Sequence, residues 1–222
     1  MSDPRLKIGL LGGTFDPCHN GHLALAEAAA DFCSLNRIDF IPAAQPPHKD
    51  RGQLTDYHHR ARMVELAIKG RQRFILSEVE SRLPLPSYTV DTLKYYRERY
   101  DDRCSLYFII GRDAFVEIEL WKKYREVLSL SHFIVFSRHG FENSLMPHLL
   151  EKLGYIEEKN FWYNPLTTMR IYQPSFAAPE ISSSTIRELL GHSPSQVKDI
   201  LPPSVADYIF YNQLYGTQST AS

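Results

Sequence analysis

Short apolar runs alternate with amphipathic stretches along the chain, and this alternation predicts the fold. The runs 6–11, 38–42, 74–76, 105–110 and 133–136 are short, apolar and bounded by turn residues, which is typical of buried strands. Helical spacing of apolar residues predicts helices at 22–32, about 56–69, 89–100, 114–120, 121–128, 181–190 and 203–214. Strands that alternate with helices indicate an α/β fold, with a doubly wound, mostly parallel sheet and helices on both faces.

The domain expectation follows from length and from the lack of any internal repeat. A chain of 222 residues can form one large domain or two small ones. We expect a single domain over 1–222, with a core at about 6–213 and a frayed tail at 216–222. Residues 139–169 are the least regular part, apart from an expected helix at 146–153, and 170–173 look like a last strand.

The first strand runs into a glycine turn that is the strongest chemical signal in the chain. Gly12-Gly13 ends the apolar run, and His19 and His22 come just before the alanine-rich helix. A glycine turn at a helix start offers backbone N–H groups and the positive end of the helix dipole to an anion. The two imidazoles add side-chain donors on one face. The alternatives are a phosphate site and an ordinary strand–helix turn with two surface histidines.

Further polar signatures follow the other strand-like runs. They are the 43–56 loop, Gly111-Arg112-Asp113, Ser137-Arg138 and Ser182-Ser183-Ser184. Ligands of doubly wound folds bind at the carboxyl ends of the strands. Loops that are far apart in the chain should therefore meet in one active cleft.

Composition excludes several function classes. The formal net charge of −1 gives no global basic field, so a nucleic-acid-binding module is disfavoured. The three cysteines have neither disulfide-framework nor zinc-site spacing, and Cys18 looks like a filler position rather than a nucleophile. With no secretory signal and no apolar run of membrane-spanning length, we expect a cytoplasmic protein without a membrane partner. The oligomeric state stays open.

Known nucleotide motifs narrow the choice of fold. The chain has no Gly-x-x-x-x-Gly-Lys-Ser/Thr and no Gly-x-Gly-x-x-Gly after the first strand. Instead, five motifs occur in the order seen in the bacterial nicotinate-mononucleotide adenylyltransferases, which the chain resembles over about residues 6–213. They are Gly12-Gly13-Thr14-Phe15-Asp16-Pro17-x-His19-x-Gly21-His22, Pro42-x-x-x-Pro46-Pro47-His48-Lys49, Ser87-Tyr88-Thr89-Val90-Asp91-Thr92-Leu93, Gly111-x-Asp113 with Trp121 eight residues later, and Ile181-Ser182-Ser183-Ser184-Thr185-Ile186-Arg187. Ser184 stands where the family usually has Thr, and it keeps the hydroxyl.

The resemblance implies that ATP and nicotinate mononucleotide give nicotinate adenine dinucleotide and pyrophosphate. The expected ATP-binding residues are Gly12, Gly13, Thr14, Phe15, His19, His22, Gly111, Asp113, Arg138, Ile181, Ser182, Ser183 and Arg187. Four residues are expected to act in catalysis. His19 and His22 would stabilise charge on the phosphates, Arg187 would hold the leaving pyrophosphate, and Lys49 would contact the incoming phosphate. Mg²⁺ would arrive with ATP, because no carboxylate cluster forms a dedicated cage.

The mononucleotide is expected to bind through residues from later motifs. These are Thr14, Lys49, Tyr88, Thr89, Asp113, Trp121 and Lys122. Trp121 would stack on the pyridine ring, and backbone N–H groups near Thr89 and Lys122 would take its carboxylate. For single residues simpler readings remain: core packing for Trp121, a helix cap for Asp113 and the hydroxyls, and a solvated loop lysine for Lys49.

Other readings of the same chain remain open. An enzyme of this class could prefer nicotinamide mononucleotide or act on phosphopantetheine, and a non-catalytic nucleotide sensor could share the fold. Trp121 and the Ser87-Tyr88-Thr89 loop favour a pyridine ring. His19, His22 and Arg187 are all present, which favours a catalyst over a sensor.

Overall fold

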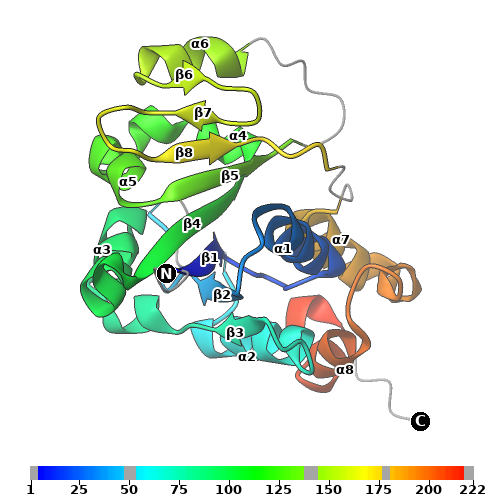
Figure 1. The fold of residues 1–222 in the computed structure, drawn as a ribbon. Helices are drawn as coiled ribbons and strands as arrows, with labels where there is room; N and C mark the ends of the chain where they lie inside the picture. Colours follow the sequence, from blue (N-terminus) through cyan, green and yellow to red (C-terminus); the bar gives the residue numbers. More distant parts are fainter. Residues whose placement is uncertain (1–4, 48–53, 138–144, 177–180, 218–222) are drawn as a thin grey trace.

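A single eight-stranded sheet runs through the computed structural model, which describes residues 5–47, 54–137, 145–176 and 181–217 (Figure 1). The strand order is β3-β2-β1-β4-β5-β8-β7-β6. The strands are β1 (Leu6–Gly13), β2 (Arg37–Pro42), β3 (Phe74–Leu76), β4 (Cys104–Gly111), β5 (His132–Phe136), β6 (Ile156–Glu157), β7 (Trp162–Tyr163) and β8 (Arg170–Tyr172). Strands β1 to β5 and β8 pair in parallel, and only the pairings of β6 and β7 are antiparallel. The expected mostly parallel sheet is confirmed.

Helices cover both faces of this sheet (Figure 1). One face packs against α1 (Asn20–Cys33), α2 (Tyr57–Ile68), α7 (Ser183–His192) and α8 (Pro203–Tyr211). The other packs against α3 (Thr89–Tyr100), α4 (Arg112–Phe115), α5 (Tyr124–Leu130) and α6 (Leu145–Lys152). The short 3₁₀ turns are η2 (Val79–Arg82), η3 (Asp101–Arg103), η4 (Ile118–Leu120), η5 (Pro194–Val197) and η6 (Leu214–Gly216). None of the described helices is long and apolar enough to cross a membrane.

Strand β4 shows why the central strands are mostly apolar. Leu106, Phe108 and Ile110 belong to the core on the α3 face, whereas Tyr107 and Ile109 belong to the core on the α1 face. Successive side chains of a strand point to opposite faces, so a strand covered on both sides needs a continuous apolar run.

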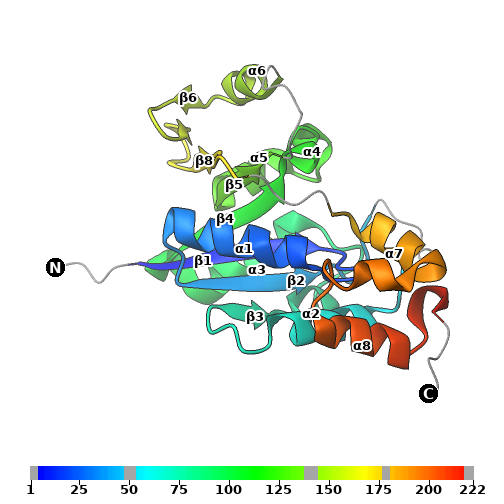
Figure 2. The same cartoon turned by 90° about the vertical axis from the view of Figure 1, so that its right-hand side faces the viewer.

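The expected helix over 121–128 is wrong in its first turn. Helix α5 begins only at Tyr124, because Lys123 before it takes a left-handed conformation with φ 54°. Trp121 and Lys122 therefore lie in the connection between η4 and α5, where their side chains are not held to a helical face. The irregular region 139–169 contains α6 and the short β6–β7 hairpin, which extends the sheet away from α8 (Figure 2).

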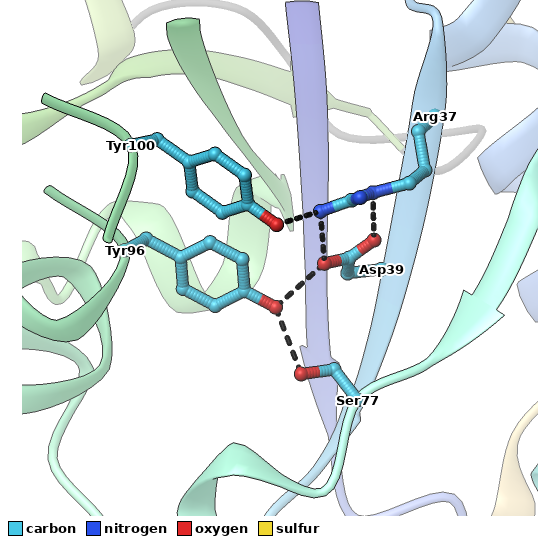
Figure 3. Close-up of polar contacts among 5 residues, drawn as sticks. All are labelled: Arg37, Asp39, Ser77, Tyr96 and Tyr100. Carbon is cyan, nitrogen blue, oxygen red and sulfur yellow. Dashed lines mark hydrogen bonds and ion pairs between the residues drawn. The ribbon is translucent and has the colours of Figure 1, made fainter. Parts of the chain in front are cut away.

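Helix α3 is tied to the sheet by a network of polar side chains (Figure 3). Asp39 on β2 is 3% exposed and forms an ion pair with Arg37, with Nε 2.7 Å from Oδ1. Its Oδ2 accepts from Arg37 Nη2 at 3.1 Å and from the Tyr96 hydroxyl at 2.7 Å. Arg37 also donates to the Tyr100 hydroxyl at 2.8 Å, and the Tyr96 hydroxyl lies 2.8 Å from Ser77 Oγ. A buried charge needs such partners, so the network fixes α3 on the sheet. The start of α3 carries part of the candidate site.

Candidate active site

The turn between β1 and α1 brings the two motif histidines into contact. His19 is the N-cap of α1 and is 5% exposed, and its backbone N–H donates to Nδ1 of His22 at 3.2 Å. The two rings lie 3.7 Å apart between centroids. Because Nδ1 of His22 accepts a hydrogen bond, the proton of the neutral ring is on Nε2, where it can be donated.

Two neighbours fix this pair in place. A Cβ at Gly21 would lie 2.9 Å from Nδ1 of His19, so the glycine of the His-x-Gly-His motif leaves space for the ring. Phe15 is 1% exposed and packs edge-on against His22, with the two ring centroids 4.9 Å apart. Its side chain therefore supports the turn from the core, and only its backbone is left for the ATP contact that we expected.

A cavity of about 500 Å³ opens at the carboxyl ends of β1 and β4. These strands mark the point where the strand order reverses, which is where doubly wound folds bind ligands. Most of the predicted ATP-binding residues line it, together with four of the predicted mononucleotide-binding residues, two of which belong to both sets. They are Gly12, Gly13, Thr14, His19, His22, Thr89, Gly111, Asp113, Trp121, Ile181, Ser182 and Ser183.

A second cavity of about 370 Å³ adjoins the first. It shares Ser87, Thr89 and Trp121 with the larger one and adds Tyr88 and Lys122. The predicted residues Lys49 and Arg138, and His48, lie outside the described residues. A separate groove of about 1100 Å³ runs between α1 and the β6–β8 segment, and the predicted site residues do not line it. Below, the larger cavity means the one of about 500 Å³.

The start of α7 contacts the turn between β1 and α1, although most of the sequence separates the two. Arg187 donates through Nη1 to the carbonyl oxygen of Asp16 at 2.7 Å, and Ser183 Oγ donates to the carbonyl oxygen of Pro17 at 3.1 Å. Ser182 caps the helix, because its hydroxyl accepts from the backbone N–H of Thr185 at 3.1 Å. Of these hydroxyl residues, Ser182 is the helix cap, and Ser182 and Ser183 line the cavity. Arg187 itself lies behind the turn rather than among the lining residues.

The predicted pyridine pocket is framed by α3 and the η4–α5 connection. Trp121 packs edge-on against Phe108, with ring centroids 6.1 Å apart, and lines both cavities. Lys122 Nζ lies 4.1 Å from the centroid of the Tyr88 ring and 3.2 Å from Oδ2 of Asp91. Thr89 is the first residue of α3, so backbone N–H groups of a helix start face this region.

Asp113 stands at the end of β4, as the motif predicted. The N-cap of α4 is Gly111, so the alternative reading of Asp113 as a helix cap is wrong. Its carboxylate is exposed and lines the cavity. An exposed carboxylate at this place can accept hydrogen bonds from ribose hydroxyls.

Sequence reasoning gave no site role to four polar residues around the site, three of them buried and one half-buried. Arg60 is 2% exposed and donates to the carbonyl oxygens of Thr14, Ala43 and Thr55. Its one signal was its position on the apolar stripe of the helix, beside Met63, Val64 and Ala67.

Two of the other three are carboxylic acids. Glu80 is 8% exposed, lines the larger cavity and accepts from the Thr92 hydroxyl at 2.8 Å, and burial raises its pKa. Asp16 is fully buried and accepts from the hydroxyl of Tyr215, the fourth of these residues.

Cys18 is fully buried, and the described residues hold no cluster of potential metal ligands. Burial raises the pKa of the Cys18 thiol to about 12, so this residue is no nucleophile at neutral pH. Among the described residues, no group of three or more His, Cys, Asp or Glu side chains could hold a metal ion.

The chain is similar to known proteins over most of its length. The cytidylyltransferase-like family model matches residues 10–189. A protein of Desulfotalea psychrophila named "probable nicotinate-nucleotide adenylyltransferase" is 40% identical over 211 residues, which cover 94% of this chain and 99% of that protein. A protein of Pelobacter propionicus with the same name is 38% identical over 215 residues, covering 95% and 98%.

Solved structures share the fold. The nicotinic acid mononucleotide adenylyltransferase of Plasmodium falciparum, complexed with NaAD, superposes with a TM-score of 0.76 at 22% identity, covering 96% of this chain and 98% of that one. The same protein complexed with APC gives a TM-score of 0.74.

Proposed function

The chain belongs to the cytidylyltransferase-like family, among the nicotinate-nucleotide adenylyltransferases, and from this premise we propose that it transfers the adenylyl group of ATP to nicotinate mononucleotide. The products are nicotinate adenine dinucleotide and pyrophosphate, in the synthesis of NAD. The observation that carries this proposal is the joined pair of cavities, in which donors suited to phosphate stand at one end and Trp121 at the other.

The chemistry is a direct displacement at phosphorus. A phosphate oxygen of the mononucleotide attacks the α-phosphorus of ATP, and the bond from that phosphorus to the β-phosphate oxygen breaks in line with the attack. The attacking phosphate is already ionised, so no general base is needed, and the protein contributes position and charge stabilisation.

His19 and His22 stabilise the charge that develops on the α- and β-phosphates. The bond from His19 N–H to Nδ1 of His22 leaves Nε2–H of His22 as the phosphate donor. Gly12, Gly13 and Thr14 let the backbone approach the phosphates, and the start of α7 adds Ser182, Ser183 and the N–H groups of its first turn. Arg187 holds the leaving pyrophosphate, for which its guanidinium turns from its present contact with the Asp16 carbonyl.

The metal enters with the nucleotide, and we propose Mg²⁺ bound to ATP as the substrate form. The residues present fit a metal carried by phosphate, because Asp16, the carboxylate in the turn, is fully buried and occupied by Tyr215 and Thr55. The ion would neutralise phosphate charge while the protein's own residues position the reacting groups.

The mononucleotide occupies the second half of the site. Trp121 stacks on the pyridine ring, Tyr88 closes the smaller cavity, and backbone N–H groups at Thr89 and Lys122 donate hydrogen bonds to the carboxylate. Asp113 holds a ribose hydroxyl, Lys49 meets the incoming phosphate, and Arg138 lies along the adenine. An anionic carboxylate gains charge-assisted hydrogen bonds that an amide lacks, so the acid is the preferred substrate.

We also propose that the chain works as one domain in the cytoplasm. The two cores share a single sheet, and Cys18, Cys33 and Cys104 are thiols, as in a reducing compartment.

Pyrophosphate release by the purified protein, measured with Mg²⁺, ATP and either mononucleotide, tests the proposal. We expect dinucleotide and pyrophosphate in equal amounts, with a higher kcat/KM for the acid than for the amide. Preference for the amide would overturn the substrate assignment. Tight ATP binding without any dinucleotide would favour a nucleotide sensor.

A further inference from the structure

The last described residues of the chain fold back onto the turn between β1 and α1, which holds Asp16. The hydroxyl of Tyr215 in η6 donates to Oδ1 of Asp16 at 2.6 Å, across 199 positions of sequence. Asp16 is fully buried, and its other oxygen accepts from the backbone N–H of Thr55 at 3.2 Å. A buried carboxylate is costly unless its oxygens are hydrogen-bonded, and Tyr215 supplies the hydrogen bond to Oδ1, beside the charge of Arg60.

Asp16 is also the residue through which the ATP side of the site is assembled. Its carbonyl oxygen accepts from Arg187, and the carbonyl oxygen of the next residue, Pro17, accepts from Ser183. His19 follows two residues later at the start of α1. Tyr215 therefore holds the segment that joins the two histidines to α7.

The backbone around Tyr215 takes a shape that needs to be held. Gln213 and Tyr215 have φ values of 54° and 60°, in the left-handed region that non-glycine residues rarely adopt. Thr217 helps to stabilise the turn, because its hydroxyl donates to the carbonyl oxygen of Leu214 at 2.9 Å. Such strained backbone persists where surrounding contacts hold it in place, and here the hydrogen bond from Tyr215 to Asp16 is such a contact.

We propose that Tyr215 is a positioning residue of the adenylyl-transfer site, which acts on ATP through Asp16. The proposal rests on the proposed function for the identity of the ligand. The residues around the mononucleotide cavity, Tyr88, Thr89, Trp121 and Lys122, belong to other segments than those that Tyr215 contacts. Loss of the Tyr215 hydroxyl should therefore affect the ATP half of the site selectively.

The test compares Tyr215→Phe with Tyr211→Phe. Both changes remove one hydroxyl, and Tyr211 is a matched control because it lies four residues earlier and is 88% exposed. For Tyr215→Phe we expect kcat/KM for ATP to fall roughly ten- to a hundredfold, as small displacements of a positioned group can do. The KM for the mononucleotide should stay within about twofold of the wild-type value, and Tyr211→Phe should match the wild type.

A double-variant cycle with Asp16→Asn tests the route of the effect. If Tyr215 acts through Asp16, the loss in the double variant will be smaller than the product of the two single losses. Independent effects, or equal rises in both KM values with a lowered Tm, would overturn the proposal in favour of a merely structural tyrosine.

Binding of ATP alone, measured by calorimetry, separates this proposal from the proposed function. Weaker ATP binding by Tyr215→Phe supports the positioning role even if the wild type makes no dinucleotide. Unchanged ATP binding and unchanged kcat/KM for ATP overturn it even if the wild type is fully active.

Discussion

The guanidinium of Arg60 donates to the carbonyl oxygen of Thr14 at 2.9 Å, although 46 positions separate the two residues. The same Nη1 atom donates to Ala43 at 2.8 Å, and Nε donates to Thr55 at 2.9 Å. Thr14 and Ala43 follow β1 and β2, and both line the larger cavity. One buried cation on α2 thus joins the turn after β1 to the loop after β2.

Replacing Arg60 with lysine should weaken both stability and substrate binding. A single ammonium cannot reproduce the planar fork, and a buried carbonyl left without a donor costs about 1–3 kcal/mol. We expect the free energy of unfolding in urea to fall by about 2–4 kcal/mol, and both KM values to rise because both loops lose their anchor.

Arg62→Lys is the control on the same helix. Arg62 is exposed and pairs with Glu65, so its replacement should change the free energy of unfolding by less than about 0.5 kcal/mol. Equal stability of the two lysine variants would contradict the anchoring role of Arg60.

The sequence predicts the strands and motifs that are formed by residues close together in the chain. It does not predict contacts between side chains that are far apart in the chain. The apolar runs placed β1 to β5, because most positions of a strand covered on both faces are apolar. The motif around His19 and His22 was readable because the turn and the helix start are contiguous. In contrast, the contact of Tyr215 with Asp16 has no local signature, since both are ordinary polar residues until the fold brings them together.

The error at Trp121 has a similar cause. Apolar spacing favoured a helix through 121–128, but Lys123 takes a left-handed conformation that spacing does not encode. The break frees Trp121 from the helix and lets it line both cavities.

Replacing His22 should remove a donor that acts mainly in the transition state. We expect His22→Ala to lower kcat by a hundredfold or more, as loss of one preorganised donor does elsewhere. His22→Asn is the sharper variant, because its Oδ1 can still accept from the His19 backbone N–H while the Nε2 donor is lost. This variant should keep the wild-type Tm and lose as much kcat as the alanine. Wild-type kcat in His22→Asn would show that the ring only caps the helix.

Replacing Trp121 should act on the mononucleotide alone. The side chain lines the smaller cavity and packs on Phe108, so Trp121→Ala removes the stacking surface and should raise the KM for nicotinate mononucleotide about tenfold or more. Trp121→Phe keeps an aromatic face and should lose less. Steady-state kinetics with each substrate varied will check this, and an equal rise in the KM for ATP would instead indicate disruption of the whole site.

The stability of the protein should fall as the pH drops from about 6.5 toward 4, because of His132. Burial, followed by the charges of Arg170, Arg97 and Lys7, lowers the pKa of His132 to about 4. Its Nδ1 accepts from the backbone N–H of Arg170 at 3.0 Å, which requires the neutral ring. The unfolded chain keeps a histidine pKa near 6.5, so between these pH values the unfolded state binds more protons. The free energy of unfolding should then fall by about 2–3 kcal/mol over this window.

His132→Asn isolates this contribution, because Oδ1 of asparagine can accept from Arg170 and does not titrate. Urea unfolding at a series of pH values should show a shallower acid slope for His132→Asn than for the wild type. His148→Asn is the control, since His148 is exposed on α6 and its replacement should leave the wild-type slope. If all three proteins lose stability in parallel between pH 6.5 and 4, the burial of a neutral His132 is not the cause, and the acid sensitivity belongs to other groups.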